Sequence, residues 1–292
     1  MSDDLTQLNK EAIASAQKYM GKISWLTVIY TFSVVIGTIA FLYFYSQGDI
    51  PLIPAIVGLA ALTYFSYSAL HEAAHGNING NNKKLQWLND LCGYLAAPLI
   101  SVPYASHRYE HMNHHRHTNQ ADKDPDFVIS GMQHGFVSFI KTVLVFIWMQ
   151  ITYFARVKWD TAPTKERAIY CAELMFSLGW RVALLAYAPS IELALVLVLG
   201  FLLGGTFTAY WFAYRPHIPY QETARYRNTN NLIVPVWLKP FEWIWVGQNL
   251  HAIHHLFPRV PFYKYHALYS DIEPILRKQG TPILGVFSRK PV

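Results

Sequence analysis

Residues 51–76 read PLIPAIVGLAALTYFSYSALHEAAHG, a stretch that combines an apolar run with a metal-binding motif. Residues 51–70 carry no charge, and about 20 such residues suffice for a helix to cross the hydrocarbon core of a bilayer. His71 and His75 follow directly, four residues apart and therefore on one face of a helix. The stretch predicts a membrane-spanning helix that ends in two metal ligands.

Three more stretches are apolar and long enough to span a membrane. They are residues 23–45, 168–188 and 191–214. The composition agrees, because 52% of the 292 residues are hydrophobic and 14% are charged, against about 25% charged in soluble domains. We therefore expect one all-α integral membrane domain over residues 1–292, with four transmembrane helices, interfacial helices and a histidine-rich cap at 215–292 that holds two metal ions.

Two further apolar stretches are poor candidates for a crossing. Residues 91–104 are short and rich in proline, so we expect a re-entrant or interfacial hairpin there. Residues 135–154 are long enough, but they include Lys141 and lead into the basic loop 156–167. Basic residues concentrate on the cytoplasmic side of membrane proteins. Four spans, with 135–154 lying along the inner interface, place every basic segment on that side.

This topology predicts a cytoplasmic N-terminal segment at 1–22, a cytoplasmic cap and two cytoplasmic termini, in a bacterial inner membrane. The first 22 residues are polar and mixed in charge, so no cleavable signal peptide is expected. The net charge of +6 fits membrane orientation better than nucleic-acid binding, because no groove-reading motif accompanies it. Two cysteines are too few for a disulfide framework or an iron-sulfur cluster.

Histidines form the clearest functional pattern, and most of the thirteen fall into spaced clusters. HxxHH occurs twice, at 111–115 and 251–255, and positions i, i+3 and i+4 share one face of a helix. Together with HEAAH, the motifs supply eight imidazoles on the predicted cytoplasmic side: His71, His75, His111, His114, His115, His251, His254 and His255. Eight ligands exceed the needs of one tetrahedral zinc, so two metal ions are implied. Imidazole alone does not identify the metal.

HEAAH, HMNHH and HAIHH, in this order and with two spans before the first and two between the second and third, resemble the histidine boxes of the membrane fatty acid desaturase and hydroxylase superfamily. The resemblance extends from about residue 23 to about residue 268. It implies that the box histidines hold two irons, which activate O2 for attack on an unactivated C–H bond. It also implies a ninth ligand at His217, in RPHIP, and a water-mediated ligand at Asn249.

The substrate class implied by the resemblance is a long hydrocarbon lipid. HTNQADKDPDF and YRPHIP resemble bacterial carotenoid ketolases and hydroxylases, whereas HHLFPRVPFYKYHAL is similar to the ending of desaturases. Fatty acyl chains and carotenoids both stay open, as do desaturation, hydroxylation, ketolation and oxidative decarboxylation.

Electrons must come from another protein, because the chain has neither a G-x-G-x-x-G fingerprint nor cysteines for an iron-sulfur cluster. We expect a ferredoxin, rubredoxin or cytochrome b5 type of donor on the basic residues of the cytoplasmic face, which are Arg225, Arg227, Lys239, Arg259 and Lys264.

Two other functions stay open. A zinc-dependent intramembrane metalloprotease would use HEAAH with Glu72 as general base, but it would leave both HxxHH motifs unexplained. A histidine-rich membrane protein that binds metal without catalysis is the second. In the di-iron interpretation, Glu72 either orients a ligand imidazole or is an ordinary residue on the helix surface. Asp124 and Asp126 either hydrogen-bond to ligand histidines or form an ordinary turn. Arg181, inside the third span, marks a functional position whose partner the sequence does not identify.

Overall fold

Long apolar helices dominate the computed structural model, which describes residues 3–292. Among the described residues, five helices are long and apolar enough to cross a membrane. They are α2 (Trp25–Ser46), α3 (Leu52–Ala74), α6 (Phe136–Tyr153) with η3 (Phe154–Lys158), α7 (Thr164–Tyr187), and α8 (Ile191–Thr208) with η4 (Ala209–Tyr214) and η5 (Arg215–His217). Four of them match the predicted spans. The fifth is α6, so the four-span topology stays a prediction.

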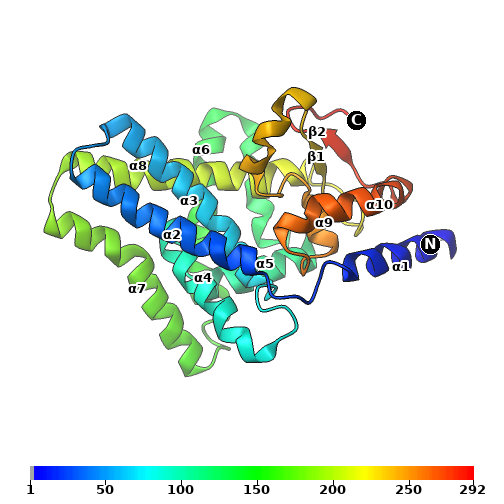
Figure 1. The fold of residues 1–292 in the computed structure, drawn as a ribbon, viewed down its shortest axis with the longest axis horizontal. Coiled ribbons are helices and arrows are strands. Elements are labelled where there is room, and N and C mark those ends of the chain that lie inside the picture. Colours follow the sequence, from blue (N-terminus) through cyan, green and yellow to red (C-terminus); the bar gives the residue numbers. More distant parts are fainter. Residues whose placement is uncertain (1–2) are drawn as a thin grey trace.

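The α3 helix is the centre of the apolar bundle. It packs against α2, α8 and α4 (Gln86–Ile100), and α2, α3 and α8 run alongside one another in Figure 1. Two glycines bring α8 close to α3, because a Cβ at Gly200 would lie 2.9 Å from the Leu59 side chain and one at Gly204 would lie 2.5 Å from the carbonyl oxygen of Ala60. Small residues at such spacing let membrane helices approach closely.

The proline-rich stretch at 91–104 forms the second part of α4 and the bend of a helical hairpin with α5, while its re-entrant or interfacial position stays a prediction. The α4 helix ends at Ile100, the backbone at Ser101 is left-handed with φ of 58°, and α5 (Tyr104–His117) begins after Pro103. The chain folds back here, because a Cβ at Gly93 would lie 2.8 Å from the Tyr104 ring. The helix α5, which carries the second histidine motif, therefore lies beside α3.

The α6 helix packs mainly against elements of the second histidine segment. Its neighbours are α5 and η2 (Pro125–His134), a 3-10 helix that begins eight residues after the end of α5. The short η1 (Lys83–Leu85) lies between α3 and α4 in the sequence.

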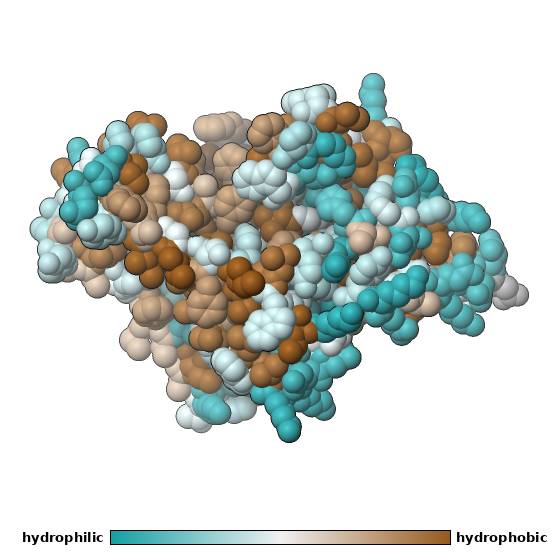
Figure 2. All heavy atoms as spheres, viewed as in Figure 1, coloured by the Kyte–Doolittle hydropathy of each residue, from teal (hydrophilic) through white to brown (hydrophobic). Residues whose placement is uncertain are grey.

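A polar cap closes one end of the bundle. Its elements are β1 (Asn231–Ile233), η6 (Val236–Trp245), α9 (His251–Leu256), η7 (Phe262–Lys264), α10 (Tyr265–Gln279) and β2 (Ile283–Gly285). The strands pair in parallel, with Leu232 opposite Leu284. Helix α1 (Asp3–Gln17) packs on α10, so both ends of the described chain lie at the cap (Figure 1). Figure 2 shows hydrophilic residues gathered over this end and exposed hydrophobic residues over the middle of the bundle.

Replacing Gly204 by leucine should destabilise the bundle, because the new side chain meets backbone of α3 that cannot move aside. The free energy of unfolding should fall by about 1–3 kcal/mol. The measurement is thermal or denaturant unfolding of the purified protein in detergent. Gly179→Ala on α7 is the control, since nothing lies within 4 Å of its Cβ position; equal stability of the two variants would contradict close α3–α8 packing.

Candidate metal centre

Nine histidines from four elements converge where α3, α5, η5 and α9 meet. The first cluster consists of His71, His75, His111, His115 and His254, whose ring nitrogens all lie within 4.8 Å of one another. The second cluster contains His114, His217 and His255 within the same limit, and His251 joins it through contacts with His217 and His255. The structure thus brings together all eight box histidines and His217.

Short distances between Nε2 atoms characterise the first cluster. They are 2.8 Å for His75–His111, 3.1 Å for His111–His115, 2.8 Å for His115–His254 and 3.0 Å for His71–His254. Metal–nitrogen bonds of about 2.0–2.1 Å at right angles place two ligand nitrogens about 3 Å apart. Most of these side chains are buried. The donor set therefore fits a bound metal ion.

The second cluster has the same character. Its Nε2–Nε2 distances are 3.3 Å for His114–His255, 3.2 Å for His217–His251 and 3.1 Å for His251–His255. The rings of His115 and His255 stack with centroids 4.1 Å apart, so the two clusters adjoin. This arrangement fits two metal ions side by side.

Each HxxHH motif is divided between the clusters. On α5, His111 and His115 belong to the first cluster, and His114 belongs to the second. On α9, His254 belongs to the first cluster, and His251 and His255 to the second. The three histidines of one motif share a helix face, as their spacing predicts, but in the structure each of these helices reaches over both clusters.

Contacts at the helix ends fix the positions of the helices that carry the histidines. The Ala73 carbonyl at the end of α3 accepts hydrogen bonds from Asn89 Nδ2 at 3.0 Å and from the Tyr104 hydroxyl at 2.9 Å. The start of α9 is held by β1, since the Ala252 N–H donates to the Asn231 side chain at 3.1 Å. Before His217 the chain forms the π-helical turn η4, a rare conformation that is frequent at functional sites.

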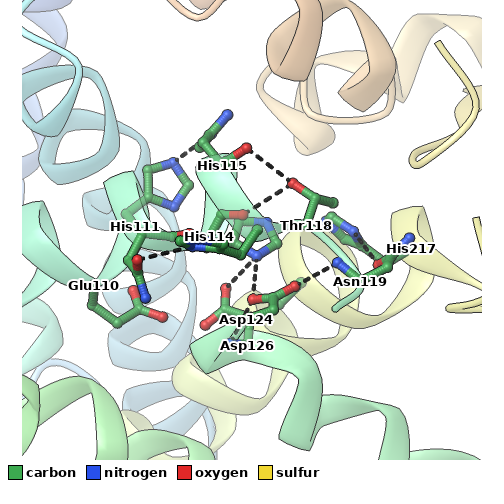
Figure 3. A network of polar contacts seen from close by, with 12 residues as sticks. Glu110, His111, His114, His115, Thr118, Asn119, Asp124, Asp126 and His217 are labelled. Carbon is green, nitrogen blue, oxygen red and sulfur yellow. Dashed lines mark hydrogen bonds and ion pairs between the residues drawn. The ribbon is translucent and has the colours of Figure 1, made fainter. Parts of the chain in front are cut away.

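The Nδ1 atoms of five cluster histidines face other side chains. The partners are Asp124 for His114 at 2.8 Å, Tyr265 for His254 at 2.9 Å, Gln248 for His251 at 3.1 Å, Asn119 for His217 at 3.3 Å and Thr118 for His255 at 3.4 Å. Figure 3 shows Asp124 and Asn119 beside their histidines. Such contacts orient metal-ligating histidines. Tyr265, Asn119, Gln248 and Thr118 are not predicted from the sequence; only Gln248 and Thr118, each three residues from a box histidine, have a local signal.

Asp124 also forms a turn, so both interpretations of its sequence context hold. Its Oδ1 accepts from the Asp126 N–H at 2.9 Å and its Oδ2 accepts from the Asn119 N–H at 2.7 Å. Asp126 lies farther from His114, at 3.8 Å, and accepts from the Gln150 amide. The turn therefore holds Asp124 in place against His114.

Burial keeps most cluster imidazoles neutral. It lowers the pKa of His75 to about 3, and burial together with neighbouring imidazoles lowers the pKa values of His111, His115 and His254 well below the usual range. Neutral imidazoles have the free lone pair that metal binding requires. His114 differs: burial opposes its protonation, but Asp124 and Asp126 outweigh that effect and raise its pKa.

Two predicted site residues point elsewhere. Asn249 donates to the Leu232 carbonyl at 3.2 Å and to Glu242 at 3.0 Å, so its role as a water-mediated ligand stays a prediction. Glu72 accepts from the Phe262 N–H at 3.4 Å on the side of α3 that packs against η7. Both residues are fully buried.

A small cavity of about 30 Å³ lies beside the first cluster. Its walls are mostly apolar and include Tyr67, Ile100, Val102 and Phe212, with His107 at the polar end. The Tyr67 ring lies 5.5 Å from the His71 ring, between cavity and cluster. His107 turns its Nδ1 towards Gln150, at 3.2 Å. An apolar group in this cavity would therefore lie close to a metal ion held by the first cluster.

Comparison with known proteins identifies relatives along most of the chain. The sn-1 oleoyl-lipid 12-desaturase of Anabaena variabilis is 25% identical over 253 residues, which cover 77% of this chain and 69% of that protein. An omega-3 fatty acid desaturase of the endoplasmic reticulum from Vigna radiata var. radiata is 23% identical over 248 residues, which cover 76% of this chain and 62% of that protein.

A shorter match connects the chain to carotenoid enzymes. Beta-carotene 4-ketolase 3 of Haematococcus lacustris is 34% identical over 102 residues, which cover 32% of this chain and 29% of that protein. The family model described as fatty acid desaturase matches residues 48–287, which include all three histidine boxes and His217. The resemblance seen in the sequence is confirmed, and the chain belongs to the fatty acid desaturase family.

Proposed function

We propose that this protein is a membrane oxidoreductase that holds two irons and uses O2 and external electrons to oxidise unactivated C–H bonds of a long hydrocarbon lipid. The observation that carries the proposal is the pair of adjoining clusters, in which nine histidines place their Nε2 atoms about as far apart as ligands of a shared metal ion. Family membership supports oxidation of a lipid.

The zinc protease alternative has less support. One tetrahedral zinc takes four ligands, whereas nine imidazoles are assembled here. The general base of a protease must reach a metal-bound water, but Glu72 faces the backbone of Phe262. Glu72 fits better as a residue that joins α3 to the cap. The alternative of a non-catalytic metal binder is less consistent with the apolar cavity beside the first cluster.

Bound iron would supply the activation of O2, and the chain's own residues would place and protect the reaction. His71, His75, His111, His115 and His254 would hold one iron, and His114, His217, His251 and His255 the other. Asp124, Tyr265, Gln248 and Asn119 would keep the imidazoles aimed inward. The cavity beside Tyr67 has a volume of about 30 Å³, so its apolar walls would have to move apart to hold an apolar chain against the first cluster and exclude water there.

Both substrate classes keep support. The relatives include enzymes named for fatty acyl lipids and for beta-carotene. The mostly apolar cavity suits a hydrocarbon of either kind. We therefore propose fatty acyl or carotenoid substrates, with desaturation, hydroxylation or ketolation as outcomes.

The membrane arrangement is part of the proposal. We infer four spans, with α6 along the inner interface, because α6 packs on α5 and η2 beside the histidines. The cap and both ends of the chain would then face the cytoplasm of a bacterial cell. A ferredoxin, rubredoxin or cytochrome b5 type of donor would bind there. Arg227 and Lys239 already pair with Glu222 and Glu242, and Arg259 donates to Asn81, so the exposed Lys264 is the better candidate for contact.

Metal analysis tests the two clusters separately. We expect about two irons per chain in the purified protein and about one fewer in His254→Ala or His217→Ala, since each removes a ligand of one cluster. His134→Ala, on an exposed part of η2, should keep the wild-type content. A single zinc per chain that His254→Ala leaves in place would contradict the proposal.

Asp124→Ala should weaken iron binding without removing a ligand. The His114 imidazole loses the partner that orients it, and such changes typically cost 10–100-fold in metal affinity. Retention of iron against a chelator is the measurement. Asp122→Ala, an exposed carboxylate in the same loop, is the matched control; identical iron retention in the two variants would argue against Asp124 as a support of His114.

Lipid profiling tests the reaction. Cells that express the wild-type chain should gain a double bond, hydroxyl or keto group in either acyl lipids or carotenoids, and cells that express His254→Ala should not. Fatty acyl chains and carotenoids are measured in the same extracts by mass spectrometry. An iron-loaded wild-type protein that changes neither pool, in a host that contains both, would refute lipid oxidation.

A further inference from the structure

Two ionisable side chains on α7, Glu173 and Arg181, face the hairpin of α4 and α5. Figure 1 shows α7 at the edge of the bundle with α4 beside it, and α7 packs on α4 and α5. Only Tyr170 and Ser177 of α7 are buried, whereas Met175 is 70% and Val182 65% accessible. Ionisable residues in an apolar helix are costly and mark a function by default.

Arg181 binds the C-terminal end of α4. Its guanidinium donates to the carbonyl oxygens of Pro98 at 2.9 Å and Leu99 at 2.8 Å. The Trp180 indole donates to the same Pro98 carbonyl at 3.0 Å, and the guanidinium lies 4.3 Å from the Trp180 ring centroid. The last carbonyls of a helix lack partners within the helix and carry partial negative charge. Arg181 therefore satisfies carbonyl groups at the end of α4 from a partly buried position.

Glu173 binds the N-terminal end of α5. Its Oε2 accepts from the Ala105 N–H at 2.8 Å, in the first turn of α5. The first N–H groups of a helix are unpaired and carry partial positive charge, so a carboxylate stabilises them. Between the two ends, the Ser101 hydroxyl donates to the Ser177 carbonyl at 3.4 Å. One face of α7 thus holds the end of α4, the bend and the start of α5.

The bend that α7 holds is also a wall of the cavity beside the first cluster. Ile100 and Val102 line that cavity together with His107. The α5 helix then continues from the bend to His111, His114 and His115. A shift of the bend would therefore move the cavity wall relative to the histidines, and misplacement of a reacting group by about 1 Å can cost on the order of 100-fold in rate.

We propose that Glu173 and Arg181 are positioning residues that fix the depth of the α4–α5 bend and thereby select which carbon of the lipid is oxidised. The inference rests on the proposed function, since it assigns the cavity to the substrate. It adds a role for a helix that supplies none of the nine clustered histidines. The two side chains act through backbone atoms of the bend and do not themselves contact the clusters in the described residues.

The test combines one structural and one chemical readout. Val102→Cys in a Cys171→Ser background reports on the bend, because the remaining Cys92 is buried; labelling by a membrane-permeant maleimide is followed over time. Arg181→Met, Arg181→Lys, Glu173→Leu and Glu173→Gln are compared in this background. In the chain with its native cysteines, the same four variants are assayed for iron content and for the position of the oxidised carbon. Val182→Leu, on the exposed face of α7, is the control.

Arg181→Met and Glu173→Leu should label about tenfold faster, because each helix end loses its charged partner and the bend opens more often. Both should keep wild-type iron content and give products oxidised at shifted positions. Glu173→Gln still offers an acceptor to Ala105 and should restore the wild-type pattern, with Arg181→Lys intermediate. Unchanged labelling, or unchanged product positions in an active Arg181→Met variant, would overturn the proposal. If the wild type oxidises no lipid, the proposed function fails, and the labelling rates still decide whether α7 holds the bend.

Discussion

Nine imidazoles, most of them neutral and with neighbouring Nε2 atoms about 3 Å apart, are the constraint on which the rest of the structure depends. Lone pairs that face one another at this distance repel, and a shared cation turns that repulsion into attraction. The surrounding elements must therefore hold four separate chain segments against each other. Three sets of contacts serve that purpose: the hydrogen bonds to the Ala73 carbonyl at the end of α3, the contact of β1 with the start of α9, and the side chains that face the Nδ1 atoms.

Much of this arrangement follows from short-range patterns. The apolar runs predict the helices, the proline-rich stretch predicts the hairpin, and i, i+3, i+4 spacing predicts which histidines leave a helix together. Other features depend on contacts between distant segments. Tyr265 reaches His254 from α10, and Asn119 reaches His217 across 98 positions. The division of each HxxHH between two clusters likewise follows from how α5 and α9 cross, which periodicity does not reveal.

The α7 helix illustrates what a hydropathy pattern conceals. Its sequence marks Arg181 as unusual and names no partner, because the partners are backbone carbonyls of Pro98 and Leu99. Backbone groups carry no sequence signature. Glu173, which lies two turns earlier, would pass for a surface charge without the hairpin beside it. Together the two side chains supply hydrogen-bond partners for the ends of α4 and α5, which meet at a bend beside an apolar cavity.

The split of both motifs also sets the order in which the protein can mature. Residues 251–255 and Tyr265 follow every apolar helix in the chain, yet they complete clusters that begin with His71. During synthesis the bundle is therefore finished while each cluster still lacks ligands. On the proposed function, metal acquisition would be a late event that follows folding of the cap, and a chain that ends before residue 251 would lack ligands in both clusters.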